Sequence, residues 1–272
     1  MEYEQNKEFM RKKIYAESYL FHKKIDTRTA DHLESVINNW HYEENNYDGR
    51  WQIMEQFNEP KGKKILDLAS GVGTFVLHGL NKGYDVHGVE PSEWKLSYIS
   101  NKIKEKAYPV SYADRFVKGF GENLPFDDDS FDFITSYQTL EHVQDIEKCL
   151  YEMFRVLRPG GKLWLQAPDY NSWYEPHYRV PFLPKMNKNL AKFYLKSISR
   201  PPSGLSTLQW TTTKYVLSII KKDSFYRTSV FDVSKFRRDR TVKACSEKYK
   251  IPYFLSSIIT KIIDCKVIFK QE

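Results

Sequence analysis

The chain has 272 residues, 41% of them hydrophobic, and a formal net charge of +7. This length accommodates one α/β domain with additions. Its three cysteines (149, 245 and 265) are scattered without a C-x-x-C pair, which excludes a disulfide framework and a cysteine zinc site and predicts a reducing compartment. The charged N-terminus and the absence of an uncharged apolar run of about 18 residues predict a cytoplasmic protein without a membrane span.

The charge is divided unevenly along the chain. Residues 1–184 carry 23 Lys and Arg against 29 Asp and Glu, whereas residues 185–272 carry 19 against 6. The basic C-terminal part is either a set of solvated helix faces or a surface for an anionic substrate, a nucleic acid or an acidic membrane.

The first 60 residues predict helices, and the residues that follow predict alternating strands and helices. Apolar residues recur at helical spacing around residues 9–21, 32–40 and 50–57, and Pro60-Lys-Gly62 closes this region. Strands are expected at residues 64–68, 85–89, 115–119, 131–136 and 162–167, helices at 74–82, 91–106 and 146–157, and a turn at 159–161. This alternation is typical of a parallel sheet with helices on both faces.

The C-terminal part predicts a helix at residues 214–222 and two further strands at 225–233 and 265–270. About thirty residues separate the two strands. Within them, residues 251–263 are apolar enough for a buried helix or for a contact with a membrane surface.

The most informative local pattern is the segment ILDLASGVGTF at residues 65–75. A short strand carries Asp67, turns tightly through Gly71 and Gly73, and opens a helix, which is how a doubly wound α/β fold builds a nucleotide-type pocket. Glu90 ends the second strand, where a carboxylate can accept hydrogen bonds from a ribose diol. Val76 stands where the dinucleotide pattern G-x-G-x-x-G has its third glycine, and the chain contains no phosphate-loop motif. The alternative to a ligand site is an ordinary strand–turn–helix that binds nothing.

Further motifs follow in order: GENLPF at 121–126, SFDFITS at 130–136, LEHV at 140–143 and FRVLRPGGKLWL at 154–165. Together with the Gly-rich turn, they make residues 62–170 closely resemble the class I S-adenosylmethionine-dependent methyltransferases, in particular the ubiquinone-type small-molecule branch. The resemblance implies an α/β, doubly wound, seven-stranded, mostly parallel sheet with a Rossmann-like methyltransferase fold, whose last two strands are antiparallel. We therefore expect an N-terminal helical cap at 1–60, a cofactor-binding core at 61–170, an acceptor-site lid or insertion at 171–210, and a C-terminal completion of the sheet with a helical insertion at 211–272.

The resemblance also assigns cofactor contacts for S-adenosylmethionine. This cofactor carries no phosphate, so its site needs close backbone approach and few cations. Four residues of the turn would lie beside the methionine part, and a carboxylate would hold the ribose. The expected residues are Asp67, Ala69, Gly71 and Gly73 for methionine, Glu90 for the ribose, Gly121 and Glu122 for adenine, and Ser136 and Tyr137 beside the sulfonium. Phe120 stands where the family often has Asp, so the adenine contact would come from a backbone N–H or from packing of Phe120.

Methyl transfer is an in-line displacement, and a hydroxyl acceptor also needs a base near neutral pH. His177 is the preferred candidate, with Asp169 second. His142 is the third candidate, and its alternative role is to tie its loop to the following helix. Relatives that bind magnesium have an acidic residue where this chain has Gln138, so no metal is expected.

The segment after the fifth strand, residues 167–184, is dense in aromatic and polar residues and lies where open α/β sheets place their ligands. It would be either the acceptor site or a lid without chemistry. The expected substrate contacts are Tyr170, Tyr174, Glu175, Tyr178 and Arg179. An anionic acceptor would require Arg179, Lys185, Lys188, Lys192 and Arg200 to converge near the cofactor's sulfur.

The sequence therefore predicts an enzyme, an S-adenosylmethionine-dependent methyltransferase that O-methylates a small molecule or a sugar or glycan precursor, with an anionic acceptor as one alternative. A nucleic-acid methyltransferase is the first alternative; Ser136-Tyr-Gln-Thr stands where base-amino methyltransferases carry Asn/Asp-Pro-Pro-aromatic, which argues against nucleic acid as a partner. The second alternative is a non-catalytic scaffold. Such proteins usually lose the Gly-rich turn or the carboxylate that binds the ribose, whereas this chain keeps Gly71, Gly73 and Glu90. A peripheral membrane contact stays open, and the sequence does not determine the oligomeric state.

Overall fold

The computed structural model describes the chain except for residues 1, 43–49, 58, 223–227, 232–265 and 272. Its contacts divide it into two compact units. The first unit comprises Met1–Ser136 and Lys148–Leu163, and the second comprises Tyr137–Glu147 and Trp164–Glu272.

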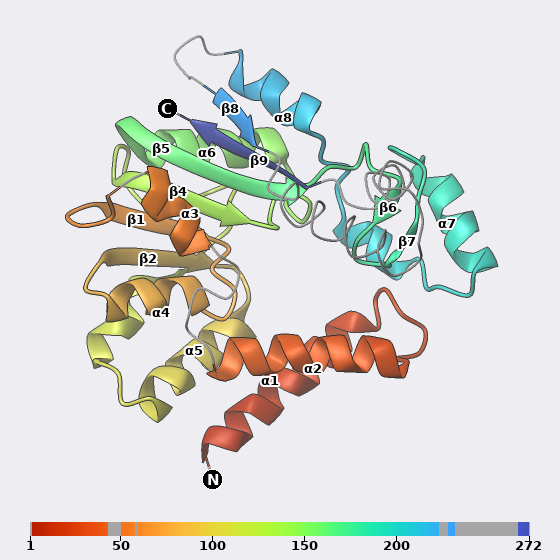
Figure 1. Ribbon diagram of the computed structural model, residues 1–272, viewed down its shortest axis with the longest axis horizontal. Coiled ribbons are helices and arrows are strands. Elements are labelled where there is room, and N and C mark those ends of the chain that lie inside the picture. The colour runs from red at the N-terminus through yellow and green to blue at the C-terminus, as the bar shows by residue number, and fades with distance from the viewer. Residues whose placement is uncertain (1, 43–49, 58, 223–227, 232–265, 272) are drawn as a thin grey trace, which may run out of the picture. The chain divides into compact units, whose positions relative to one another are not determined.

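The first unit is built on the parallel part of a sheet with the strand order β3-β2-β1-β4-β5 (Figure 1). Its strands are β1 (Lys64–Leu68), β2 (Asp85–Glu90), β3 (Phe116–Lys118), β4 (Phe131–Tyr137) and β5 (Leu157–Pro168). β1 lies between β2 and β4, with Asp67 in register with Gly88 on one side and Thr135 on the other. Because β1 and β4 are buried over almost their whole length, their continuous apolar runs are what a central parallel strand requires.

Helices cover this sheet as the alternation in the sequence predicts. They are α4 (Thr74–Asn81), α5 (Glu93–Glu105) and α6 (Ile146–Val156), with a short 3-10 helix η1 (Val110–Arg115) before β3. α4 contacts β2, and α5 contacts both β2 and β3 (Figure 1). The result is the α/β Rossmann-like arrangement with five parallel strands, in which the carboxyl ends of β1, β2 and β4 share one edge.

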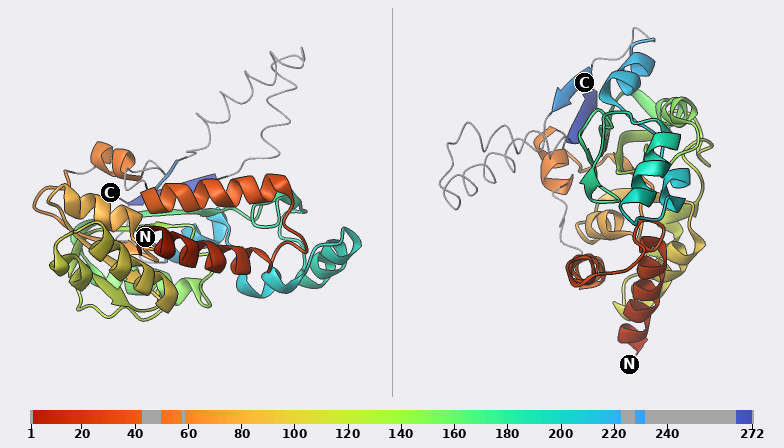
Figure 2. Two further views of the ribbon diagram at one scale, coloured as in Figure 1. Left: turned by 90° about the horizontal axis from the view of Figure 1, so that it is seen from below. Right: turned by 90° about the vertical axis from the view of Figure 1, so that its right-hand side faces the viewer.

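Three helices precede the sheet: α1 (Glu2–Ser18), α2 (Thr27–Tyr42) and α3 (Arg50–Phe57). α1 lies beside α2 and α5 (Figure 2). Met10, Ile37 and Tyr98 share a buried cluster with Val72 of the Gly-rich turn. The N-terminal helices therefore pack on the turn itself. None of the helices that the structure describes combines the length and apolar character needed to cross a membrane.

In the second unit, the end of β5 pairs antiparallel with β9 (Lys266–Gln271), which in turn pairs antiparallel with β8 (Thr228–Phe231). The remaining elements are β6 (Tyr174–Glu175), β7 (Val180–Pro181), α7 (Lys188–Ser197), the 3-10 helix η2 (Ser203–Thr207) and α8 (Thr213–Ile220). The side chain of Thr212 caps α8 by accepting a hydrogen bond from Tyr215 N at 3.2 Å. The expected apolar helix at 251–263 lies outside the described residues.

The expected turn at residues 159–161 is wrong, because β5 runs without interruption from Leu157 to Pro168. Gly160 has φ 76°, a backbone conformation that residues with a side chain rarely adopt. A glycine in this conformation lets the strand continue through a local irregularity, so the Pro-Gly-Gly string does not end it.

Candidate cofactor and acceptor residues

The Gly-rich turn after β1 is held in a tight, partly left-handed conformation. Ala69, Gly71 and Gly73 have φ values of 58°, 59° and 80°. Ser70 N donates to Val89 O at 3.0 Å, and Gly73 N donates to Ser70 O at 3.0 Å. A Cβ on Gly73 would lie 3.0 Å from the ring of Phe116, so both the backbone and the packing require glycine there. This geometry brings bare backbone to the edge of the sheet where a ligand can approach.

Glu90 joins the turn to the end of β2. Its side chain is 2% exposed, and its carboxylate accepts hydrogen bonds from Gly71 N at 2.8 Å and from Ser92 N at 3.1 Å. Lys95 Nζ lies 3.5 Å from the same carboxylate. An ionised carboxylate offers about four acceptor positions, so Glu90 can brace the turn and still accept from the two hydroxyls of a ribose.

Asp67 is fully buried and forms an ion pair with Arg50, the first residue of α3, at 2.7 Å. The Arg50 guanidinium also lies 4.5 Å from the centroid of the Phe75 ring. Arg50 is not among the residues predicted from the sequence. No local pattern marks it, because its partner is 17 positions away in another element.

The remaining cofactor candidates of the first unit are also placed by close packing. A Cβ on Gly121 would lie 2.7 Å from the sulfur of Cys149, a buried free cysteine on α6. Ser136 is 1% exposed at the end of β4, and Phe120 is 58% exposed. Tyr137 follows Ser136 along the chain and belongs to the second unit.

In the second unit, His177 is held by a buried carboxylate. His177 Nδ1 lies 2.8 Å from Glu175 Oε1, and Tyr170 donates its hydroxyl to the same oxygen at 3.1 Å. Glu175 is fully buried and also accepts from Tyr178 N at 2.5 Å. Burial alone lowers the pKa of His177, but the hydrogen bond and charge of Glu175, aided by the charge of Glu141, outweigh it and raise that pKa above 6.5.

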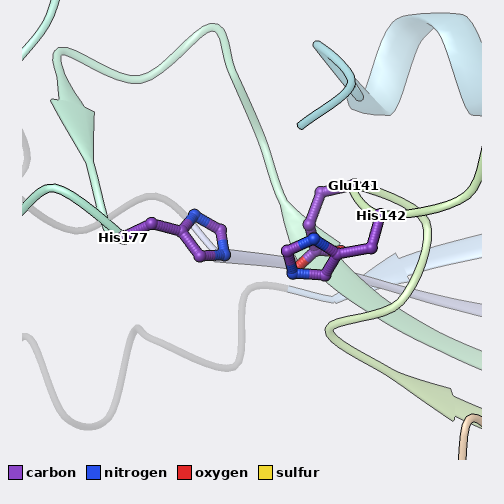
Figure 3. A group of neighbouring side chains, drawn as sticks. All are labelled: Glu141, His142 and His177. Carbon is purple, nitrogen blue, oxygen red and sulfur yellow. The ribbon is translucent and has the colours of Figure 1, made fainter. Parts of the chain in front are cut away.

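Two further side chains gather around His177. The rings of His142 and His177 are 5.1 Å apart and nearly perpendicular, at 83°. The potential ligand atoms of Glu141, His142 and His177 all lie within 4.8 Å of one another (Figure 3). His142 Nδ1 lies 3.1 Å from Thr207 O, so this histidine also ties its loop to η2. We refer to Glu141, His142 and His177 as the histidine cluster.

The hydrogen bonds of the Asp169 carboxylate hold neighbouring parts of the chain in place. Its carboxylate accepts from Asn171 N at 2.8 Å and from Thr213 Oγ1 at 2.6 Å, which anchors the start of α8. Tyr170 and Tyr178 are almost fully buried, and Tyr170 stacks on Trp210 with ring centroids 4.7 Å apart. These tyrosines therefore act mainly as supports for the segment.

The other candidates for substrate contact, Tyr174 and Arg179, are partly buried. Lys185 and Lys192 are exposed, and Lys188 donates to Leu208 O at 2.8 Å. The convergence of these cations stays a prediction, and so does the anionic acceptor.

Comparison with known proteins agrees with this site. Residues 66–165 match the family described as "Methyltransferase domain". The chain is 29% identical over 211 residues to the demethylmenaquinone methyltransferase of Bacillus velezensis, an alignment that covers 73% of this chain and 88% of that protein. It is 32% identical over 117 residues to the demethylmenaquinone methyltransferase of a Geobacillus species, covering 42% of this chain but only about half (49%) of that protein.

Among solved structures, the fold is similar to an S-adenosylmethionine-dependent methyltransferase from Mesorhizobium loti, with a TM-score of 0.54 and 16% identity over 82% of this chain and 97% of that one. A parallel sheet with a Gly-rich turn and a ribose-type carboxylate defines a Rossmann-like enzyme of nucleoside-containing cofactors. The family match and these relatives identify residues 66–165 as a methyltransferase domain of the S-adenosylmethionine-dependent kind, with S-adenosylmethionine as its cofactor.

Proposed function

We propose that this methyltransferase transfers the methyl group of S-adenosylmethionine to an oxygen of a small-molecule acceptor. The observation that carries the proposal is the His177–Glu175 pair in the segment after β5, because a hydroxyl acceptor needs a positioned base. In this reaction the bond between sulfur and the methyl carbon breaks as the bond between acceptor oxygen and methyl forms. The products are S-adenosylhomocysteine and a methyl ether, and the hydroxyl proton passes to His177 Nε2.

The cofactor would be held by the first-unit residues that surround the turn. Glu90 would accept from the ribose hydroxyls, and the backbone at Gly71 and Gly73 would face the methionine part. The Arg50–Asp67 pair places a cation beside an anion, which complements the carboxylate and the ammonium of an amino-acid tail. Gly121 and Glu122 would border the adenine, and Ser136 at the end of β4 would border the sulfonium.

His177 is the best of the three candidate bases. Glu175 binds its Nδ1, so proton transfer would use Nε2, and the raised pKa makes the ring a stronger base. Asp169 is committed to Asn171 and Thr213, and His142 to the carbonyl of Thr207. We infer that residues 171–210 form the acceptor-site lid and that β9 and β8 complete a seven-stranded sheet.

A second candidate acceptor is a carbon of a hydroxylated aromatic ring. It is favoured by the relative named demethylmenaquinone methyltransferase, of which the alignment covers 88%. Removal of a phenolic proton places negative charge on ring carbons as well as on oxygen, so the same base would serve either transfer. A sugar or glycan hydroxyl remains within the proposal, and so does an anionic acceptor.

The first test is titration of the full chain with S-adenosylhomocysteine in a calorimeter. Absence of binding at about 1 mM, an affinity weaker than about −4 kcal/mol, would refute the proposal. A panel of hydroquinones, phenols and sugars, with product methyl groups located by NMR, then separates oxygen from carbon as the nucleophile.

The second test is His177→Gln. We expect a loss of about 10²- to 10⁴-fold in kcat with unchanged affinity for S-adenosylhomocysteine. His32→Gln is the matched control, because His32 is an exposed residue of α2. Unchanged turnover in His177→Gln would exclude this residue as the base.

A further inference from the structure

We propose that the histidine cluster of Glu141, His142 and His177 is a binding site for a divalent first-row transition-metal ion of the zinc type. The three potential ligand atoms lie within 4.8 Å of one another (Figure 3). Bonds of about 2.0–2.2 Å to zinc place ligand atoms roughly 3–4 Å apart, so small side-chain rotations bring the three to an ion. All three residues belong to the second unit.

Both imidazole rings are oriented by their second nitrogen. His177 Nδ1 is bound to Glu175 at 2.8 Å, and His142 Nδ1 lies 3.1 Å from the backbone oxygen of Thr207. A metal-ligating histidine almost always donates its other N–H to a carboxylate or a carbonyl, which fixes the tautomer and the ring direction. In each ring this arrangement assigns Nε2 to the ion. Both Nδ1 atoms thus have the kind of partner, a carboxylate for His177 and a backbone carbonyl for His142, that orients metal-ligating histidines.

The supports of the two rings are themselves fixed. Glu175 also accepts from the Tyr170 hydroxyl and from Tyr178 N. Thr207, which supports His142, donates its hydroxyl to Gly204 O at 2.8 Å within η2. The supports of both histidines therefore have hydrogen bonds of their own.

Glu141 supplies the third ligand and the negative charge. Its side chain is fully buried, and its backbone oxygen accepts from Gln209 N at 2.7 Å, which fixes its place in the chain. Burying a carboxylate is costly unless a positive charge is close. An ion bound between Glu141 and the two rings offsets that cost more completely than a neutral imidazole does.

The ligand set points to a transition metal and away from magnesium. Imidazole nitrogen suits zinc, cobalt, nickel, copper and iron, whereas magnesium takes oxygen ligands. Two histidines and one carboxylate leave a fourth position open, as catalytic zinc sites do. His142 is exposed, so the cluster can be reached from solvent. A bound ion would occupy Nε2 of His177, so metal binding and proton acceptance by this residue are alternatives at one atom.

The test uses the full chain, treated with a chelator, dialysed, and titrated with Zn²⁺ by calorimetry and with Co²⁺ by visible absorption. We expect one ion per chain and a tetrahedral or five-coordinate Co²⁺ spectrum. His142→Gln and His177→Gln should each weaken binding at least about 100-fold, and Glu175→Gln about 10- to 100-fold. His32→Gln is the control and should bind like the unmodified chain.

No Zn²⁺ binding at about 100 μM, about −5.5 kcal/mol, would overturn the proposal, as would full binding by both His142→Gln and His177→Gln. Thermal unfolding of the ligand-free protein shows that each variant is folded, and S-adenosylhomocysteine binding shows that the cofactor site is kept. The two proposals fail separately. Zinc binding without S-adenosylhomocysteine binding would remove the methyltransferase proposal, and the reverse result would remove only the metal site.

Discussion

Replacing Glu90 by Gln tests the cofactor site most directly. The change keeps the shape of the side chain but removes its charge and turns one of its two acceptor oxygens into a donor. In the structure these oxygens face two backbone donors, Gly71 N at 2.8 Å and Ser92 N at 3.1 Å. In one of these contacts the amide N–H of the new glutamine therefore faces a backbone N–H, so no hydrogen bond forms there. The ribose also loses a charged acceptor.

The size of the effect follows from these contacts. A hydrogen bond to a charged group contributes about 1.5–3 kcal/mol, so loss of one such bond to the ribose should weaken S-adenosylhomocysteine binding by about 10- to 100-fold. The free energy of unfolding should fall by about 1–3 kcal/mol, because a buried N–H at the turn loses its acceptor. Glu90→Ala should weaken binding by about 1–3 kcal/mol through the same loss.

The assay is calorimetric titration with S-adenosylhomocysteine, combined with denaturant unfolding of the ligand-free protein. Glu93→Gln is the matched control: Glu93 is the first residue of α5, its side chain is 79% exposed, and its partner is the surface residue Lys118. The control should change binding by less than about 0.5 kcal/mol. If Glu90→Gln binds as tightly as this control, Glu90 does not hold the ribose and the cofactor assignment is wrong.

Three further predictions concern the first unit. Burial, with the nearby Lys102 and Lys7 charges, lowers the pKa of His41 to about 4. The unfolded chain therefore binds more protons than the folded protein between pH 6.5 and 4, and the free energy of unfolding falls by up to about 3 kcal/mol as the pH drops through that range. His41→Gln should flatten this part of a curve of unfolding free energy against pH, and an unchanged curve would contradict the assignment. Gly73→Ala should destabilise the protein by about 1–3 kcal/mol in denaturant unfolding, because φ is 80° there, and a neutral effect would mean that the turn relaxes. Arg50→Gln leaves Asp67 buried without its cation and should cost about 3 kcal/mol of unfolding free energy, whereas a cost below about 0.5 kcal/mol would show that the pair is not formed in solution.

The sequence by itself determined the parallel part of the fold, and it predicted the cofactor residues. The first strand was predicted at residues 64–68, where β1 lies, and the turn, the helix after it and Glu90 follow in the expected places. These features are readable because they depend on neighbours along the chain: an apolar run predicts a buried strand, and the Gly-x-Gly string predicts a turn with positive φ. The order of the motifs then indicated the methyltransferase class.

Predictions from neighbouring residues were incomplete where a distant contact or a glycine conformation decides the structure. Pro159-Gly-Gly predicts a turn, yet β5 runs through it with Gly160 at φ 76°. Asp169 stays a predicted base, and only the structure shows that its carboxylate accepts from Thr213, 44 positions away. Turn and strand propensities are weak compared with the hydrogen bonds of a formed sheet, so the tertiary context decides.

Only the tertiary structure decided which polar side chains act together. Arg50 meets Asp67 although the two share no motif, and Glu141 and His142 meet His177 across 35 positions of intervening sequence. Such groups arise where separate loops converge, and no periodicity in the sequence records that convergence. The sequence thus identifies what each side chain can donate or accept, while the packing of distant segments selects the ones that share a proton or a ligand.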